Sequence, residues 1–129
     1  MKINGMMIED AITALGDVSV REAIQTLYQR HIGSIVVLGK DGKCEGIFTE
    51  RDAIRVVATE VPLSRPLKEV MSTNVKTVVK GTTFAEAKSI MRAHNIRHLP
   101  VTDSQGRLIG LISLRAILDE ILNMQAVKR

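Results

Sequence analysis

The chain has 129 residues, of which 45% are hydrophobic and 25% charged, a balance typical of a soluble globular protein rather than a disordered or membrane protein. Because it holds no Trp, one Tyr and two Phe, its core must be built from aliphatic side chains, which favours an α/β fold over an all-β fold. The single cysteine, Cys44, excludes an internal disulfide and a cysteine-based metal cluster, and we interpret it as a small buried hydrophobe.

The formal net charge of +4 permits an anionic partner but does not select one, because the basic residues are scattered or lie at 128–129. The sequence has no run of about 18 apolar residues, the length that a membrane-spanning helix needs. Its first residues also lack the charged, apolar and small-residue order of a secretory signal. We therefore expect a cytoplasmic protein.

The first half of the chain predicts a strand, a helix, two strands and a second helix, in that order. Ser19-Val20-Arg21-Glu22 fits a capping box, and the apolar residues that follow have the spacing of one helical face. A β-branched run and a second strand flank the turn at Lys40-Asp41-Gly42-Lys43, as in a hairpin. The expected strands are 13–15, 34–38 and 44–48, and the expected helices begin after Ser19 and Thr49.

The second half of the chain repeats the first without a gap. Gly46-Ile47-Phe48-Thr49-Glu50-Arg51 returns as Gly110-Leu111-Ile112-Ser113-Leu114-Arg115, an offset of 64 residues (110 − 46). Pro100 lies inside one of the repeated strands and predicts that this strand is an edge, because proline has no N–H for pairing. The offset predicts a helix capped by Thr83-Phe84-Ala85-Glu86, strands at 77–79, 96–102 and 108–112, and a last helix that uses Ile117, Leu118, Ile121 and Leu122.

Two tandem β-α-β-β-α units are therefore expected. They span residues 1–60 and 67–125, with a linker at 61–66 and a basic tail at 126–129. Two prolines punctuate the linker. A single unit of this size buries too little surface to be stable alone, so we expect the two units to pack against each other.

The stretch from Gly46 to Asp52 is the most informative for function, because a strand ends there and a helix begins. Unpaired N–H groups at a helix N-terminus suit phosphate or hydroxyl oxygens, and a carboxylate there can accept from the two vicinal hydroxyls of a ribose. Thr49 and Asp52 also fit a capping box, which is a purely structural explanation. The second repeat has Ala116 at the Asp52 position, so either a cap has drifted or one site is functional and its counterpart degenerate.

The β-α-β-β-α repeat, the Gly-Ile-Phe-Thr-x-x-Asp stretch and Ile96-Arg97-His98-Leu99-Pro100-Val101 together resemble a tandem pair of CBS domains, the Bateman module. The resemblance covers nearly the whole chain and implies two units packed with pseudo-two-fold symmetry. It also implies a regulatory module that binds AMP, ADP, ATP or S-adenosylmethionine in clefts between the repeats. Such a module requires no cofactor and is not an enzyme.

The resemblance also implies roles for individual residues. Asp52 would accept from the ribose hydroxyls, with Thr49 and Arg51 near the ribose and phosphates. The base pocket would be lined by Thr13, Ala14, Ser34 and Ile35. From the second repeat, Arg97 and His98 would reach the phosphate. A second site, expected to be weaker or empty because it lacks the carboxylate, would use Thr77, Val78, His98, Leu99, Pro100, Ser113 and Arg115.

Other functions have less support in the sequence. It contains no nucleophile elbow, no phosphate-binding loop and no metal-ligand cluster, so neither an enzyme nor a metal site is expected. His94 and His98 are four residues apart, but a predicted break between helix and strand separates them. A structural or nucleic-acid-binding adaptor is the alternative, favoured by the basic charge and opposed by the lack of aromatic side chains for base stacking.

The partners expected are an adenosine-containing small molecule and a second copy of the chain. Ligand binding would act by shifting the packing of the two repeats, through differential affinity for two arrangements. Because no catalytic motif accompanies the repeats, any regulated activity is expected in another polypeptide, and no membrane partner is expected. The homodimer prediction rests on the apolar residues Ile117, Leu118, Ile121, Leu122 and Met124.

Overall fold

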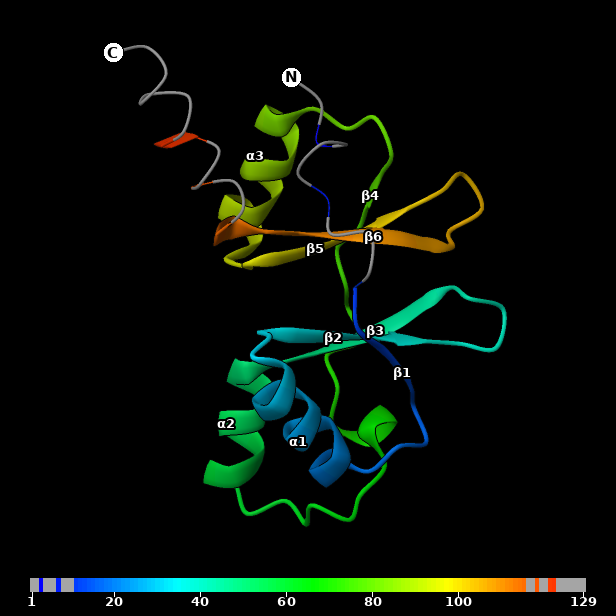
Figure 1. Cartoon of the computed structure of the whole chain (residues 1–129), viewed down its shortest axis with the longest axis vertical. Coiled ribbons are helices and arrows are strands. Elements are labelled where there is room, and N and C mark those ends of the chain that lie inside the picture. The colour runs from blue at the N-terminus through cyan, green and yellow to red at the C-terminus, as the bar shows by residue number, and fades with distance from the viewer. Residues whose placement is uncertain (1–2, 4–6, 8–10, 116–117, 119–120, 123–129) are drawn as a thin grey trace. The chain divides into compact units, whose positions relative to one another are not determined.

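The computed structural model describes residues 3, 7, 11–115, 118, 121 and 122 (Figure 1). The chain divides into two compact units. One spans Ala11–Val75, and the other combines Met1–Asp10 with Lys76–Arg129. Each unit contains a three-stranded sheet and at least one helix, so the mixed α+β class predicted from the repeat is confirmed.

The first unit follows the predicted order of elements. These are β1 (Thr13–Leu15), α1 (Val20–Arg30), β2 (Ser34–Leu38), β3 (Cys44–Thr49), α2 (Glu50–Ala58) and the 3-10 helix η2 (Leu67–Glu69). In the sheet order β1-β2-β3, β1 pairs with β2 in parallel, and β2 pairs with β3 antiparallel with Ser34 opposite Thr49. Helices α1 and α2 lie on the same side of this sheet (Figure 1).

Local signals set both ends of α1. The Ser19 hydroxyl accepts a hydrogen bond from the Glu22 N–H at 3.1 Å, which is one half of the predicted capping box. At the other end His31 adopts the left-handed conformation (φ 54°), and its N–H donates to Leu27 O. The predicted start of the helix is therefore confirmed by the cap itself.

The core of the first unit lies between its helices and one face of its sheet. Ile35 and Val37 alternate along β2 toward this core, where they pack with Phe48 of β3 and Val56 of α2. Leu67 of η2 closes the same cluster with no exposed surface. Burial of each such side chain stabilises the unit by about 1.5–3 kcal/mol.

The second unit repeats the sheet of the first. Its elements are β4 (Val78–Val79), α3 (Phe84–His94), β5 (His98–Thr102) and β6 (Leu108–Ser113), with sheet order β4-β5-β6. β4 pairs with β5 in parallel, and β5 pairs with β6 antiparallel with His98 opposite Ser113. The strands predicted at 77–79 and 96–102 begin one and two residues before β4 and β5.

Two pairs of positive-φ residues recur in the two units at the 64-residue offset. Asn95 ends α3 with φ 52°, as His31 ends α1 with φ 54°. In the hairpin turns Gly42 (φ 81°) and Gly106 (φ 85°) take the positive φ that favours glycine. The sequence repeat is therefore also a repeat of the backbone within each unit.

The compact units do not coincide with the sequence repeats. Ile3, at the start of the first repeat, is fully buried in the core of the second unit, and its N–H donates to Thr82 O at 3.1 Å. Its counterpart Leu67 is fully buried in the first unit, and its N–H donates to Val18 O at 2.7 Å. Each unit is thus completed by a segment from the other repeat.

The residues predicted as a linker, 61–66, pack on the first unit. Val61 and Leu63 contact its core, and Leu63 O accepts a hydrogen bond from the Arg21 N–H at 2.9 Å. Arg65 O accepts from the Val20 N–H at the same distance. The alternating apolar side chains hold the segment in place although it contains two prolines.

The edge position predicted for Pro100 is wrong, because β5 is the central strand of its sheet. In the first unit the counterpart Val36 donates its N–H to Ile12 O at 3.1 Å. In the second unit the pairing of β4 with β5 starts at Val78 and Val101, one residue beyond the proline. The sheet accommodates Pro100 because β4 has not yet begun where its N–H is missing.

The last predicted helix is only partly described. Leu118 and Leu122 are 51% and 60% exposed, whereas Ile121 packs against the core of the second unit. Ile117 and Met124, which also entered the dimer prediction, lie outside the described residues. Within the part of the chain that is described, we find no helix with both the length and the apolar character needed to span a bilayer.

Candidate functional site

The predicted site lies where β3 passes into α2. Thr49 ends the strand in extended conformation (φ −112°, ψ 171°) and is the N-cap of the helix. The next residue, Glu50, donates its N–H to Gly33 O at 3.1 Å, which ties the helix start to the beginning of β2. A helix N-terminus is thereby fixed beside the strand that carries Ser34.

Asp52 completes a full capping box with Thr49. Its Oδ2 accepts from the Thr49 N–H at 2.9 Å and from the Thr49 hydroxyl at 3.2 Å, while its own N–H donates to Thr49 Oγ1 at 3.3 Å. Asp52 is only 7% exposed. Asp52 therefore caps the helix, as the sequence pattern allows, and the hydrogen bonds of this cap use Oδ2 and not Oδ1.

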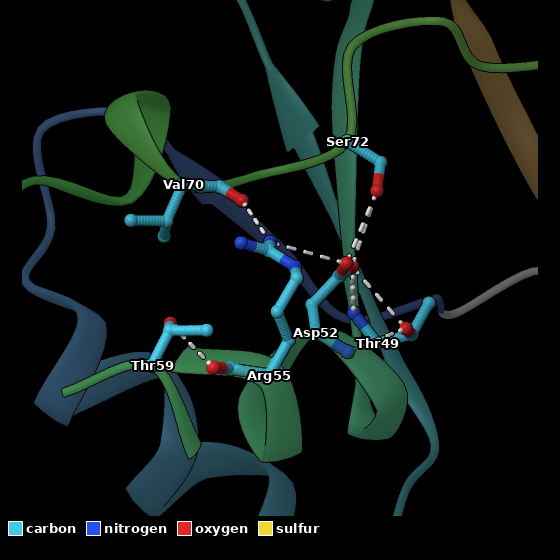
Figure 2. A network of polar contacts seen from close by, with 6 residues as sticks. All are labelled: Thr49, Asp52, Arg55, Thr59, Val70 and Ser72. Carbon is cyan, nitrogen blue, oxygen red and sulfur yellow. Dashed lines mark hydrogen bonds and ion pairs between the residues drawn. The ribbon is translucent and has the colours of Figure 1, made fainter. Parts of the chain in front are cut away.

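Two further side chains reach the Asp52 carboxylate from outside the capping box (Figure 2). The Ser72 hydroxyl lies 3.1 Å from Oδ1 and 3.4 Å from Oδ2, and Arg55 Nη2 lies 3.4 Å from Oδ1. The same Arg55 nitrogen donates to Val70 O at 2.7 Å. Asp52 is therefore the centre of a network that joins α2 to the segment after η2.

Ser34 supplies an unpaired hydroxyl next to this network. The residue is 4% exposed, and its Oγ has no hydrogen-bond partner among the described residues. It lies opposite Thr49 in the pairing of β2 with β3. A buried hydroxyl without a partner costs free energy, so this atom can accept or donate a further hydrogen bond.

The remaining residues predicted for the first site differ in their exposure. Ile35 is 1% exposed within the core, so its side chain faces away from any ligand and only its backbone remains to contact one. On β1, Thr13 is exposed and Ala14 is half-buried. Thr13 pairs with Val36 of β2, two residues after Ser34. Arg51 is exposed on the first turn of α2. The structure thus brings Ser34, Thr49 and Asp52 together within the first unit, with Thr13, Ala14, Ile35 and Arg51 on the adjoining strands and helix turn.

The residues predicted for the second site lie in the other unit. Val78 and Leu99 are 6% and 0% exposed in its core, so their side chains are committed to packing. His98 is half-buried and lies opposite Ser113. Pro100 is buried in β5. The exposed members of the predicted sets in this unit are Thr77, Arg97 and Arg115.

Two members of the Asp52 network, Arg55 and Ser72, were not predicted from the sequence. A partial signal for them exists in the repeat. At the 64-residue offset, Asp52 and Ser72 correspond to the apolar residues Ala116 and Ile8, and Arg55 corresponds to Asp119, which has the opposite charge. Thr49, the fourth polar member of the network, keeps a hydroxyl at Ser113.

The arrangement suits hydroxyl recognition better than metal binding or nucleophilic chemistry. A buried carboxylate offers acceptor oxygens, and the adjoining helix start and Arg51 favour a negative group nearby. No group of three metal-ligating side chains occurs among the described residues. Cys44 is half-buried, its S–H donates to Gly46 O at 3.7 Å, and burial raises the pKa of its thiol, as in a packed side chain.

Solved structures of similar proteins have the same fold. The CBS-domain containing protein ATU1752 from Agrobacterium tumefaciens is 36% identical, with a TM-score of 0.80 over 87% of this chain and 90% of that chain. The CBS domain protein PAE2072 from Pyrobaculum aerophilum, solved in complex with AMP, is 25% identical. Its TM-score is 0.85 over 95% of this chain and 99% of that chain.

Sequence comparison also relates the chain to part of a larger enzyme. The inosine-5′-monophosphate dehydrogenase of Aquifex aeolicus is 34% identical over 113 residues, which are 87% of this chain and 23% of the dehydrogenase. The chain therefore spans less than a quarter of that relative. The CBS domain profile matches this chain twice, over residues 3–59 and 67–123. Because the two matches take in most of both repeats, the chain belongs to the CBS-domain family, as a tandem pair of CBS domains.

Proposed function

We propose that the chain is a regulatory module that binds an adenosine-containing ligand, with Asp52 as the acceptor for the ribose hydroxyls. The observation that carries this proposal is the buried Asp52 carboxylate beside the unpaired hydroxyl of Ser34. The AMP complex of the Pyrobaculum aerophilum relative supports the ligand class. The ligands to be compared are AMP, ADP, ATP and S-adenosylmethionine.

The roles of the surrounding residues follow from their chemistry. Thr49 holds Asp52 in place, and Arg51 offers a planar fork of N–H donors to phosphate oxygens. Ser34 offers its free hydroxyl, and Thr13 with Ala14 extends the binding surface along β1. Arg97 is proposed to supply further positive charge to the phosphate, and His98 a ring nitrogen that can form a hydrogen bond with it.

A second binding event is proposed to be weaker. The second repeat keeps Ser113 and Arg115 but has Ala116 in place of the carboxylate, so a ribose there loses its charged acceptor. A hydrogen bond to a charged group contributes about 1.5–3 kcal/mol. The affinity of the second site is therefore expected to be at least about tenfold lower.

The regulatory output is proposed to be a change in the packing of a homodimer or in the binding of a separate partner protein. Ile54 and Val57 are 70% and 64% exposed on α2, and Leu118, the repeat counterpart of Ile54, is also exposed. Exposed aliphatic side chains at equivalent positions supply an apolar surface for association. No cofactor and no catalytic step is part of this proposal.

The proposal is tested by calorimetric titration of the four ligands into the wild-type chain and Asp52→Ala. We expect one ligand to bind saturably, with an affinity about tenfold or more lower in the variant, which corresponds to about 1.4 kcal/mol. Ser19→Ala is the matched control, because it also removes a helix-cap hydrogen bond but leaves the carboxylate intact. Circular dichroism confirms that all three proteins are folded.

Two results would contradict the proposal. If none of the ligands binds the folded wild-type chain, Asp52 is a helix cap only. If instead an oligonucleotide binds with steep salt dependence and Asp52→Ala has no effect, the adaptor explanation is correct. Equal losses of affinity in Asp52→Ala and Ser19→Ala would show that stability, and not the carboxylate, governs binding.

A further inference from the structure

The Asp52 carboxylate has no free position for a ligand hydroxyl. A carboxylate offers about four lone-pair sites. At Oδ2 the Thr49 N–H and hydroxyl donate at 2.9 and 3.2 Å, and at Oδ1 the Ser72 hydroxyl and Arg55 Nη2 donate at 3.1 and 3.4 Å. A ribose, which donates two hydrogen bonds, must therefore displace a partner that is already present.

Ser72 is the partner that is easiest to displace. Thr49 is held by its backbone N–H within the capping box, and Arg55 is anchored by its 2.7 Å bond to Val70 O. Ser72 is exposed, and rotation about one bond turns its hydroxyl away from Asp52 into water. Water can then replace the lost hydrogen bond at small net cost.

We propose that the Ser72 hydroxyl acts as a latch on Asp52, which competes with the ligand and opens when the ribose binds. This inference rests on the proposed function and adds a regulation of the same site. Figure 2 shows the latch, with Ser72 approaching the carboxylate from the segment that follows Val70. The latch lowers the affinity for ligands with ribose hydroxyls.

The backbone of Ser72 is held in place independently of its side chain. Ser72 exchanges two backbone hydrogen bonds with Ile47 of β3, both at 3.0 Å, so its backbone stays attached to the first unit when its side chain turns. Opening of the latch is therefore a rotation of the Ser72 side chain alone.

The latch is tested by titrating AMP into the wild-type chain and Ser72→Ala. Removal of the competing hydroxyl is expected to tighten AMP binding by about three- to tenfold. Ser72→Thr keeps a hydroxyl and is expected to bind AMP as the wild type does. Thr73→Ala is the matched neighbour, since Thr73 is exposed and its hydroxyl makes no hydrogen bond within the described part of the chain.

A second ligand separates competition from a general effect on the fold. 2′,3′-Dideoxyadenosine monophosphate has no ribose hydroxyls, so it does not compete with Ser72. We expect the wild type and Ser72→Ala to bind it equally, with its weak affinity measured by NMR titration. A change of equal size for AMP and the dideoxy compound would overturn the latch, because the variant would then act through the structure of the unit.

The remaining outcomes are also decisive. Weaker AMP binding by Ser72→Ala would make Ser72 part of the binding set, and unchanged binding would show that its hydroxyl does not compete. In both cases the proposed function stands and the latch falls. If the folded wild type binds neither AMP nor any other adenosine ligand, the proposed function fails and the latch fails with it.

Discussion

The two repeats of the chain have similar backbone geometry but differ in the polar side chains where the second helix of each repeat is predicted to begin. His31 and Asn95 end the first helices with nearly equal φ values of 54° and 52°. At the strand-to-helix junction, by contrast, Asp52 of the first repeat corresponds to Ala116 of the second, and Ser34 corresponds to His98. Backbone geometry is thus common to both copies, and the candidate ligand chemistry belongs to one.

This difference separates residues that build the fold from residues that serve a site. The first helix of each repeat has an N-cap, Ser19 in α1 and Thr83 in α3, and such a cap contributes about 0.5–2 kcal/mol. If Asp52 were needed only as a cap, the second repeat would need a capping side chain at position 116, where it has alanine. Exchanging residues between the two copies tests which differences matter.

The largest effect is expected from giving the first repeat the proline of the second. Val36→Pro removes the N–H that donates to Ile12 O at 3.1 Å and leaves that carbonyl unpaired, so we expect a loss of about 1–3 kcal/mol in the free energy of unfolding. Urea denaturation measures it. The reverse change, Pro100→Val, is expected to cost less, because β4 does not pair there. An unfolding curve for Val36→Pro equal to that of the wild type would mean that the two sheets do not differ at this position.

An intermediate effect is expected from giving the second repeat the carboxylate of the first. Ala116→Asp places an acid at the repeat counterpart of Asp52, so under the proposed function a second AMP should bind, with an affinity at least about tenfold above that of the wild-type second site. Calorimetric stoichiometry measures the change from one to two ligands. Ala116→Asn is the uncharged control. A stoichiometry of one in Ala116→Asp would contradict the prediction, because the carboxylate alone would then not be enough to create the second site.

The smallest effect is expected in the second hairpin turn, where Asp103 stands at the position of Gly39. The backbone N–H of Arg107 holds the pKa of the Asp103 carboxyl below its ordinary value, with a further bond from Gln105. Because the pKa is lower in the folded state, the ionised group stabilises the turn at neutral pH, and this contribution is lost as the pH falls through the folded pKa. Asp103→Ala should therefore lower Tm slightly at pH 7 and converge with the wild type in acid. A Tm difference that does not change with pH would contradict this assignment, and Gln105→Ala serves as the control in the same turn.

Much of the fold could be predicted because its signals are local or repeat at a fixed offset. The capping residues Ser19 and Thr83 mark where helices begin, a β-branched run marks β2, and the 64-residue offset predicts β5 within two residues. The capping box predicted at Ser19 and Glu22 has one of its two hydrogen bonds. The box at Thr49 and Asp52 has both, and its acidic residue is the shorter Asp. The edge position predicted for Pro100 is wrong, because β5 is central and the missing N–H is accommodated by the late start of β4.

The candidate site was predictable to the extent that its residues are neighbours in sequence. Thr49 and Asp52 are three residues apart on one helical turn, and their contact follows from that spacing. Ser72 reaches the same carboxylate from 20 residues away, and Arg55 is tied to Val70 across 15. No local pattern indicates such contacts, so the latch emerges only from the folded chain.

From the sequence we could predict the two copies, the order of their elements, the helix caps and the single carboxylate that distinguishes one copy from the other. These features depend on short spacings and on self-similarity, which need no knowledge of the packing. Two features are seen only in the folded chain. Leu67 and Ile3 each complete the core of the unit formed by the other repeat. The Ser72 hydroxyl donates a hydrogen bond to the Asp52 carboxylate. Burial and hydrogen bonding between residues distant in sequence depend on the tertiary packing of the whole chain, and a periodic sequence pattern does not specify that packing.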